Sequence, residues 1–503
     1  MATRRSTLAS LAALTALAAA TLTLPQHASA QQRKDSVVLG MVLEPAPGLD
    51  PTVAPAAAIG EVVHMSVLEG MTKINMDGKI TPLLAESWTI DPDGKVYTFK
   101  LKKGVKFHDG ETFDSSDVKF SFDRAKAPGS TNKAKKSVFD NISRVDTPDA
   151  HTVIIVLNNA DGNFLFRMGE NTSVILDPKS APTTASKPIG TGPFKFDNWA
   201  KGSAITLVKN DQYRDAAKVQ MKKVTFRFIN DPAAQVAALL AGDIDGMPRF
   251  GALESLKQFQ NDPRFSVAIG GTEGKTIMTI NNKKKPFDDV RVRRALAAAI
   301  DRKAVIDGAQ EGYGVPIGSH MVPSDAGYVD LTNVNPYNPD KAKALLKEAG
   351  VQTPLNVTLT LPPPAYARKG GEIIAAMLAK VGVVAKIENV EWAQWLSGTF
   401  KGNFDLTVIS HVEPLDFDRY ADTNYYYGYD SKAYRDLLAA YNSTPDQKSR
   451  LKILGDIQRQ LATDSVNVYL FQLPQFAVAN KRLKGLWSSS PIFGNDLAAL
   501  TWQ

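Results

Sequence analysis

Several stretches of the chain alternate apolar and polar positions with the two-residue period of a half-buried strand. The clearest is 96–101, where Tyr97, Phe99 and Leu101 alternate with Val96, Thr98 and Lys100 after the turn Asp91-Pro92-Asp93-Gly94. The same reasoning predicts strands at 37–42, 152–157, 204–209 and 223–229. Residues 73–185 therefore read as one unit of mixed strands and helices.

Other stretches carry helix signals at both ends. A helix is expected from Asp231-Pro232 to Gly242, and another from Asn338-Pro339 to Gly350, because proline suits the first turn and glycine the C-cap. Asp288 can cap a helix with Val292, Leu296 and Ile300 on one face, and Ser115-Ser116-Asp117 can cap one that runs to Arg124.

The second half of the chain has the order of an α/β domain. Strands are predicted at 277–281, 357–361, 383–387 and 466–470, with a helix ending near Lys380 between the second and third. A strand, helix and strand in this order form a right-handed crossover, so the two strands should be parallel.

The first thirty residues have the layout of an export signal. Arg4 and Arg5 precede an apolar stretch at 8–24, and Ala28-Ser29-Ala30 offers a cleavage site. A membrane anchor is the alternative, but an Ala/Thr-rich stretch of this length is near the lower limit for crossing a bilayer. We expect cleavage after residue 30 and an exported protein; Thr3 to Leu8 leaves open whether the general secretory or the twin-arginine route is used.

The amino-acid composition excludes several classes of site and function. The 503 residues include no cysteine, which excludes disulfides, thiolate metal sites, a cysteine nucleophile and a lipid attached through cysteine. The formal charge is +7 for the whole chain and +5 after residue 30, too small and too dispersed to indicate nucleic-acid binding. The length suggests about three domains.

No known catalytic motif is complete in this sequence. Gly274-Lys275-Thr276 resembles the end of a phosphate-binding loop, but Ile269 stands where glycine is needed and Thr276 leads into a strand. No HExxH or GxSxG pattern occurs, and the five histidines after residue 30 are not clustered in the sequence. We therefore predict no enzyme, no metal and no cofactor, and interpret the lysine runs at 133–136 and 283–285 as solvated loops.

The most informative stretch is 392–429, which holds ten aromatic residues in 38 positions. Core packing is one interpretation. The other is a wet ligand wall, because four tyrosines in five residues lie close to Asp416, Asp418 and Asp422. Both interpretations stay open at this point.

Strand geometry places part of this stretch at a sheet edge. Ligands of parallel α/β sheets bind beyond the carboxyl ends of the strands. The loop at 362–367 follows one predicted strand and His411-Val412-Glu413-Pro414 follows another, so both loops should open on one edge. Arg368 could meet an anionic ligand group there, or form a surface ion pair.

Ordered motifs over nearly the whole chain resemble the family 5 extracellular solute-binding proteins of ABC importers, the dipeptide-, oligopeptide- and nickel-binding group. They are Leu84-Ala85-Glu86-Ser87-Trp88, then Tyr97 to Gly110 (YTFKLKKGVKFHDG), Gly190-Thr191-Gly192-Pro193-Phe194, the Asn210 to Tyr213 stretch, and Val292 to Leu296 with Ala299 to Arg302.

The resemblance implies an α/β, two-lobed periplasmic binding protein fold with a hinge and an additional mixed α/β domain. Lobe I would comprise 31–72, 186–268 and 474–503, the additional domain 73–185, and lobe II 269–473. It also implies a ligand cleft between the lobes and docking of the closed form on an ABC permease and ATPase complex.

The implied ligand residues depart from the family in one place. Peptide-binding members use an aspartate for the ligand ammonium at the position of Ser410, and a neutral hydroxyl cannot replace that carboxylate. Glu413 or Asp416 could substitute, or the ligand lacks a free amine. The full set of candidate ligand residues is Glu44, Arg368, Trp392, Trp395, Ser410, His411, Glu413, Asp416 and Tyr427.

We therefore expect a monomeric periplasmic protein, not a lipoprotein, that captures a peptide-like or small polar solute and does no chemistry. A ligand-presenting receptor or chaperone on the same scaffold and an exported hydrolase are the alternatives. The sequence names neither the solute nor the permease.

Overall fold

The structure is a computed structural model that describes residues 34–54 and 56–503. The predicted export signal at 1–30 lies outside the described residues. Residues 35–503 form one unit by their internal contacts.

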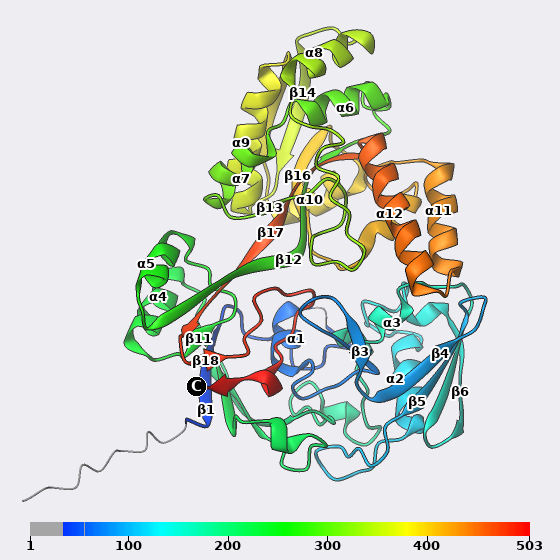
Figure 1. Cartoon of the computed structure of the whole chain (residues 1–503), viewed down its shortest axis with the longest axis vertical. Coiled ribbons are helices and arrows are strands. Elements are labelled where there is room, and N and C mark those ends of the chain that lie inside the picture. The colour runs from blue at the N-terminus through cyan, green and yellow to red at the C-terminus, as the bar shows by residue number, and fades with distance from the viewer. Residues whose placement is uncertain (1–33, 55) are drawn as a thin grey trace, which may run out of the picture. The chain divides into compact units, whose positions relative to one another are not determined.

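An eleven-stranded mixed sheet organises this unit, in the order β15-β14-β16-β12-β17-β11-β1-β10-β9-β8, with β13 paired to β17 (Figure 1). Its strands are β1 (Ser36–Met41), β8 (Phe194–Ala200), β9 (Ala204–Lys209), β10 (Lys223–Phe228), β11 (Gly246–Met247), β12 (Phe265–Ile280), β13 (Val315–Pro316), β14 (Leu355–Leu361), β15 (Val383–Asn389), β16 (Leu406–His411) and β17 (Asn467–Asn480).

The antiparallel pair β12 and β17 runs through the middle of this sheet and is much longer than predicted. The strands span 16 and 14 residues, whereas the pattern indicated only 277–281 and 466–470. The sequence pattern did not predict the full length of these strands, because they continue through Gly270, Gly271 and Pro474, and such residues normally interrupt strands. The register shifts between Gly271 and Lys275, so the pair is irregular at its centre. Gly274-Lys275-Thr276 lies inside β12, which excludes a phosphate-binding loop.

Beyond β12, the sheet has the predicted α/β order. β14 is parallel to both β15 and β16, as expected for the strand-helix-strand unit. Helix α8 lies between its N-cap Asn338 and the left-handed Gly350, as predicted. The N-cap of α6 is Asp289 rather than the predicted Asp288. The helices that bury their apolar faces here are α6 (Val290–Ala298), α7 (Arg302–Gln310), α8 (Pro339–Glu348) and α9 (Ala365–Ala379).

Beyond β11, β1 is parallel to β10, and β10 pairs antiparallel with β9. The predicted helix signals hold here: the Asp231 carboxylate accepts a hydrogen bond from Ala234 N, and Gly242 has a φ of +76° at the C-cap. The helices around this end are α1 (Ala57–Val63), α4 (Pro232–Ala241) and α5 (Leu256–Asn261).

Residues between β1 and β8 form a second, four-stranded antiparallel sheet in the order β4-β5-β7-β6, with its own hydrophobic core. Its main helix begins one residue earlier than predicted, because Asp114 and Asp117 form the capping box. The elements are β2 (Thr72–Ile74), β3 (Ile80–Pro82), β4 (Ala85–Ile90), β5 (Val96–Leu101), α2 (Ser115–Lys126), β6 (Ile142–Asp149), β7 (Thr152–Leu157) and α3 (Phe164–Arg167).

The remaining α-helices and strands of the described chain are α10 (Trp392–Ser397), α11 (Lys432–Ser443), α12 (Gln447–Asp464), β18 (Leu483–Lys484) and β19 (Thr501–Trp502). Short 3-10 helices lie between the elements, among them Asp416–Ala421. Among the described residues, no helix combines the length and apolar character that crossing a bilayer requires. The domain limits inferred from the sequence stay predictions.

Candidate ligand-binding site

Two adjoining chambers form one cavity beside the irregular centre of the β12–β17 pair. Their volumes are about 300 Å³ and about 610 Å³, the size range of small-molecule sites. Five residues line both chambers: Lys133, Glu170, Val412, Glu413 and Pro414. The cavity is thus built from segments as far apart in the sequence as Lys133 and Phe493.

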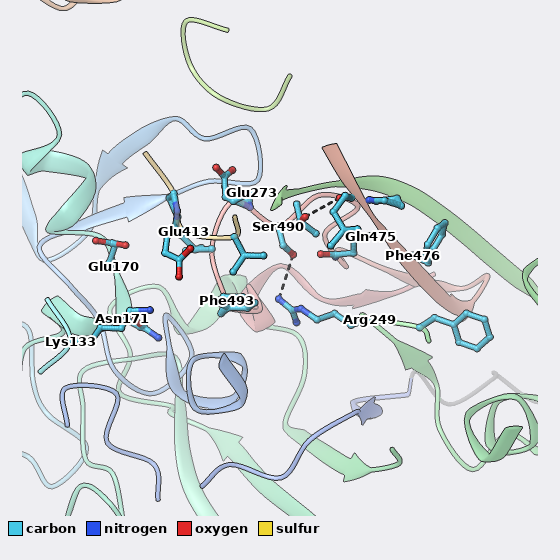
Figure 2. Close-up of a pocket in the computed structure, with 18 residues that line it drawn as sticks. Lys133, Glu170, Asn171, Arg249, Glu273, Glu413, Gln475, Phe476, Ser490 and Phe493 are labelled. Atoms are coloured by element: carbon cyan, nitrogen blue, oxygen red, sulfur yellow. Dashed lines mark hydrogen bonds between the residues drawn. The ribbon is translucent and has the colours of Figure 1, made fainter. Parts of the chain in front are cut away.

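The smaller chamber has apolar walls and a few charged groups (Figure 2). Arg249 points toward Phe493 and Ser490; its Nη2 lies 3.5 Å from Ser490 Oγ, and its Nη1 lies 3.3 Å from the Glu61 carboxylate. The apolar walls come from Phe250, Ile492, Phe493, Leu473 and Phe476.

The larger chamber has an aromatic wall on α10. Trp392 is 42% exposed and lies edge-on to Trp395, with ring centroids 5.9 Å apart. Trp395 is buried and donates from Nε1 to Thr407 Oγ1 at 3.1 Å, which fixes its ring. Leu396 and Phe400 extend the wall. Trp392 therefore offers a ligand an open aromatic face on a rigid base.

Ser410 and His411, at the end of β16, lie on the polar side of the larger chamber. The Ser410 amide donates to Tyr366 Oη at 3.2 Å, so the ends of β14 and β16 meet at one edge, as the strand geometry predicts. The Ser410 Oγ is buried and has no hydrogen-bond partner among the described residues.

Asp416 is the centre of a buried polar network below this edge. Its carboxylate accepts hydrogen bonds from Lys275 Nζ at 2.9 Å, His320 Nε2 at 2.9 Å and His411 Nδ1 at 3.1 Å. Burial raises the pKa of Asp416, but the Lys275 ammonium and the hydrogen bonds from the histidines outweigh it and hold that pKa well below its usual range. Burial lowers the pKa of His320 to about 4, so this imidazole is neutral at pH 7.

His320 and His411 therefore lie close together in space, although they are far apart in the sequence. His320, His411 and Asp416 offer donor atoms within 4.8 Å of one another, a possible metal-ligand set. Every ring nitrogen already has a protein partner, because His411 Nε2 lies 2.8 Å from the hydroxyls of Tyr426 and Tyr427, and His320 Nδ1 lies 3.0 Å from that of Tyr420. With the Lys275 ammonium on the same carboxylate, this arrangement is a hydrogen-bonded network rather than an open coordination site.

The aromatic stretch divides between the two interpretations. Its members in the larger chamber are Trp392, Trp395, Phe400 and Tyr425. Its other members are buried in a hydrophobic cluster: Phe404, Phe417, Tyr420, Tyr426, Tyr427 and Tyr429. Tyr427 is only 1% exposed and supports His411 from behind.

Two further candidates lie outside both chambers. The Glu44 carboxylate accepts hydrogen bonds from Trp199 Nε1 at 2.8 Å and Gly202 N at 3.0 Å. Arg368 forms the surface ion pair that was its alternative role, with Nη2 3.2 Å from Glu391 Oε1. The side chains of both residues are held by neighbours of their own.

Sequence reasoning missed four charged residues that line the smaller chamber: Lys133, Glu170, Arg249 and Glu273. It also missed Arg167 and Arg419 in the larger chamber. Lys133 belongs to a lysine run that was interpreted as a solvated loop. Burial raises the pKa of Glu170 and, together with the nearby Asp325 carboxylate, that of Glu273. No local motif marks these residues; only the fold brings them to the cavity.

Comparisons with known proteins agree with this architecture. The family described as bacterial extracellular solute-binding proteins, family 5 Middle, matches residues 79–434. Di/tripeptide-binding protein 1 of Pseudomonas aeruginosa (strain UCBPP-PA14) is 31% identical over 395 residues, 72% of this chain and 73% of the relative.

Two solved structures share the fold over nearly their whole length. The PBP AgaA in complex with agropinic acid, from A. tumefaciens R10, is 28% identical with a TM-score of 0.73, and the alignment covers 93% of this chain and 99% of that one. The periplasmic binding protein DppA of Helicobacter pylori in complex with the peptide STSA is 26% identical with a TM-score of 0.74, covering 93% and 98%.

Proposed function

Because the chain belongs to the bacterial extracellular solute-binding proteins of family 5, we propose that it captures a peptide-like solute in the two-chamber cavity and delivers it to an ABC importer. The observation that carries this proposal is the cavity itself. An open aromatic face and apolar walls lie next to charged groups of both signs. That combination suits a zwitterion with an apolar side chain.

Five acids of the described chain line the two chambers. Among them, Asp418 already pairs with Arg167 and Arg419, and Glu273 is buried beside Asp325. Asp416 already pairs with the chain's own ammonium, Lys275, and with two histidines. Ser410 is neutral. Glu413 is exposed and faces both chambers, and Glu170 lines both from the other side. Glu413 is thus the acid we favour for a ligand amine, with Glu170 opposite; a ligand without an amine remains the other possibility.

The β12–β17 pair is the proposed hinge. Its register shift at Gly271 and Lys275 lies beside the smaller chamber, which Thr272, Glu273 and Pro474 help to line. The proposed lobes are 31–72 with 186–268 and 474–503, and 269–473, with 73–185 as an additional domain. Both lobes and this domain contribute residues to the cavity, so closure would bring them onto the ligand. A ligand stabilises the closed form only through its higher affinity for that form.

The cellular setting follows from the same proposal. Residues 1–30 would direct export and be removed, leaving a periplasmic monomer. The chain has no cysteine to carry a lipid. The partners would be the membrane permease and its ATPase. The protein would bind its solute unchanged and need neither cofactor nor metal.

A thermal-shift panel on the purified protein tests the ligand class. It contains di- to pentapeptides with free and acetylated N-termini, opine-type amino-acid conjugates, and nickel with histidine. A ligand present at 100 times its dissociation constant adds about 2.7 kcal/mol to the free energy of unfolding. We expect free-amine peptides to raise the melting temperature and their acetylated forms to do so much less.

Three outcomes contradict parts of the proposal. If only amine-free ligands shift the melt, the cavity binds a different solute class and Glu413 does not hold an amine. If the ligand is altered in the mixture, the protein is an enzyme. A deletion strain that still imports the bound solute would indicate the ligand-presenting receptor instead.

A further inference from the structure

The loop at residues 412–415 places three consecutive residues, 412–414, in the walls of both chambers. It connects β16 to the short helix that begins at Asp416, and Val412 and Glu413 are exposed to the chambers on either side. Leu415 has a φ of +54°, a left-handed conformation that a leucine adopts only when its surroundings hold it there. Contacts with neighbouring residues must therefore hold the loop in this conformation.

Lys275 is the group that binds the loop from behind. Its Nζ donates to the carbonyl oxygen of Glu413 at 2.5 Å and lies 2.9 Å from Asp416 Oδ1, so one ammonium binds both the loop and the first residue of the helix after it. Lys275 is 1% exposed, and it is not among the residues that line either chamber in the described part of the chain. Because a buried charge is costly when unpaired, the loop is held closely around this ammonium.

The position of Lys275 in the sheet links the cavity loop to the proposed hinge. It lies in β12 at the register shift, opposite Gln472 of β17 and His411 of β16. The proposed hinge and the cavity loop therefore meet at one side chain. The other charged groups that act on Lys275 are Glu273 and Asp325, in addition to Asp416.

We propose that Lys275 is a positioning residue for ligand binding: its ammonium fixes residues 412–415 so that Glu413 faces the cavity. The inference rests on the proposed function only for what the cavity binds. Removing the ammonium should release the Glu413 carbonyl, loosen the loop and lower ligand affinity, although Lys275 touches no ligand.

The first arm of the test needs no ligand. Hydrogen–deuterium exchange is measured on peptides that cover residues 411–418 in the wild type, in Lys275→Met and in Lys275→Met/Asp416→Asn. The double variant also removes the Asp416 carboxylate, so that this acid is not left buried without its ammonium, and it keeps the test valid if the single variant folds poorly. Glu273 and Asp325 lose the ammonium in both Lys275 variants. Lys386→Met, which removes an exposed lysine on β15, is the matched control.

We expect exchange in this segment to rise at least tenfold in both Lys275 variants and not in the control. Unchanged protection of residues 411–418 in the double variant would overturn the proposal, whatever the protein binds.

The second arm uses the dipeptide L-Ala-L-Phe and calorimetric titration in a double-mutant cycle with Glu413→Gln. We expect Glu413→Gln to weaken binding at least fivefold in the wild type but less than twofold in the Lys275→Met/Asp416→Asn background. Equal losses in the two backgrounds would overturn the inference. If the wild type binds no peptide in this titration or in the thermal-shift panel, the proposed ligand class fails, and the exchange measurement decides the role of Lys275 independently.

Discussion

Replacing Trp392 with alanine tests whether the aromatic wall on α10 binds the ligand. The indole is 42% exposed, which for a side chain of about 250 Å² leaves about 100 Å² for a ligand to cover. At about 25 cal/mol per Å², full coverage is worth about 2.5 kcal/mol, or about 70-fold in the dissociation constant, and half coverage about eightfold. We therefore expect Trp392→Ala to weaken binding by about eight- to 70-fold.

The assay is isothermal titration with the peptide that gives the largest thermal shift. Tyr337→Ala is the matched control, because Tyr337 is 43% exposed but lines neither chamber. Both substitutions remove an exposed ring, so neither should change the free energy of unfolding by much more than 0.5 kcal/mol. If the dissociation constants of Trp392→Ala and Tyr337→Ala stay within twofold of the wild type, the ligand does not use this wall.

Three further predictions concern stability. Burial lowers the pKa of His64 to about 4, so the unfolded chain takes up a proton at His64 first as the pH falls. The free energy of unfolding should therefore decrease by about 2 kcal/mol between pH 7 and pH 5 through this group, and His64→Gln should remove that much pH dependence in urea titrations. Asp416→Asn removes the acid that pairs directly with the buried Lys275 ammonium and should lower the free energy of unfolding by about 3–5 kcal/mol by the same method; a loss below 1 kcal/mol would be inconsistent with the network. A Cβ on Gly270 would lie 1.9 Å from a backbone carbonyl oxygen, so Gly270→Ala should lower the free energy of unfolding by about 1–3 kcal/mol and lower the melting temperature. In Gly370→Ala the added Cβ would have room in α9, so this control variant should not lose stability.

Local signals were sufficient for the elements whose ends carry special residues. Asp231 with Gly242, and Asn338 with Gly350, gave the limits of two helices because the cap and the left-handed residue act within one turn. The caps of α2 and α6 were misplaced by one residue, since neighbouring aspartates and serines compete for the same role.

The long central strands could not be predicted in the same way. Their continuation through Gly270, Gly271 and Pro474 depends on pairing between β12 and β17, which lie about 200 positions apart in the sequence. Strand formation there is a tertiary effect, and local propensity argues against it.

The candidate site, too, could be predicted only in the parts that local sequence signals mark. The rule for strand ends correctly predicted that the segments after β14 and β16 lie at one edge, where the Ser410 amide donates to Tyr366 Oη, and the aromatic composition indicated the α10 wall. Lys133, Glu170 and Arg249 come from other segments and carry no motif. The pairing of Lys275 with Asp416 is equally invisible, because a lysine in a strand gives no sign of which acid it meets.

The most direct test of the account is a titration of the wild type and of Val412→Trp with the same peptide. Val412 is 38% exposed and lines both chambers, so an indole at this position would occupy the space proposed for the ligand. We predict one-to-one binding by the wild type and no measurable binding by Val412→Trp at an unchanged melting temperature. Equal binding by the two proteins would place the solute elsewhere and contradict the account.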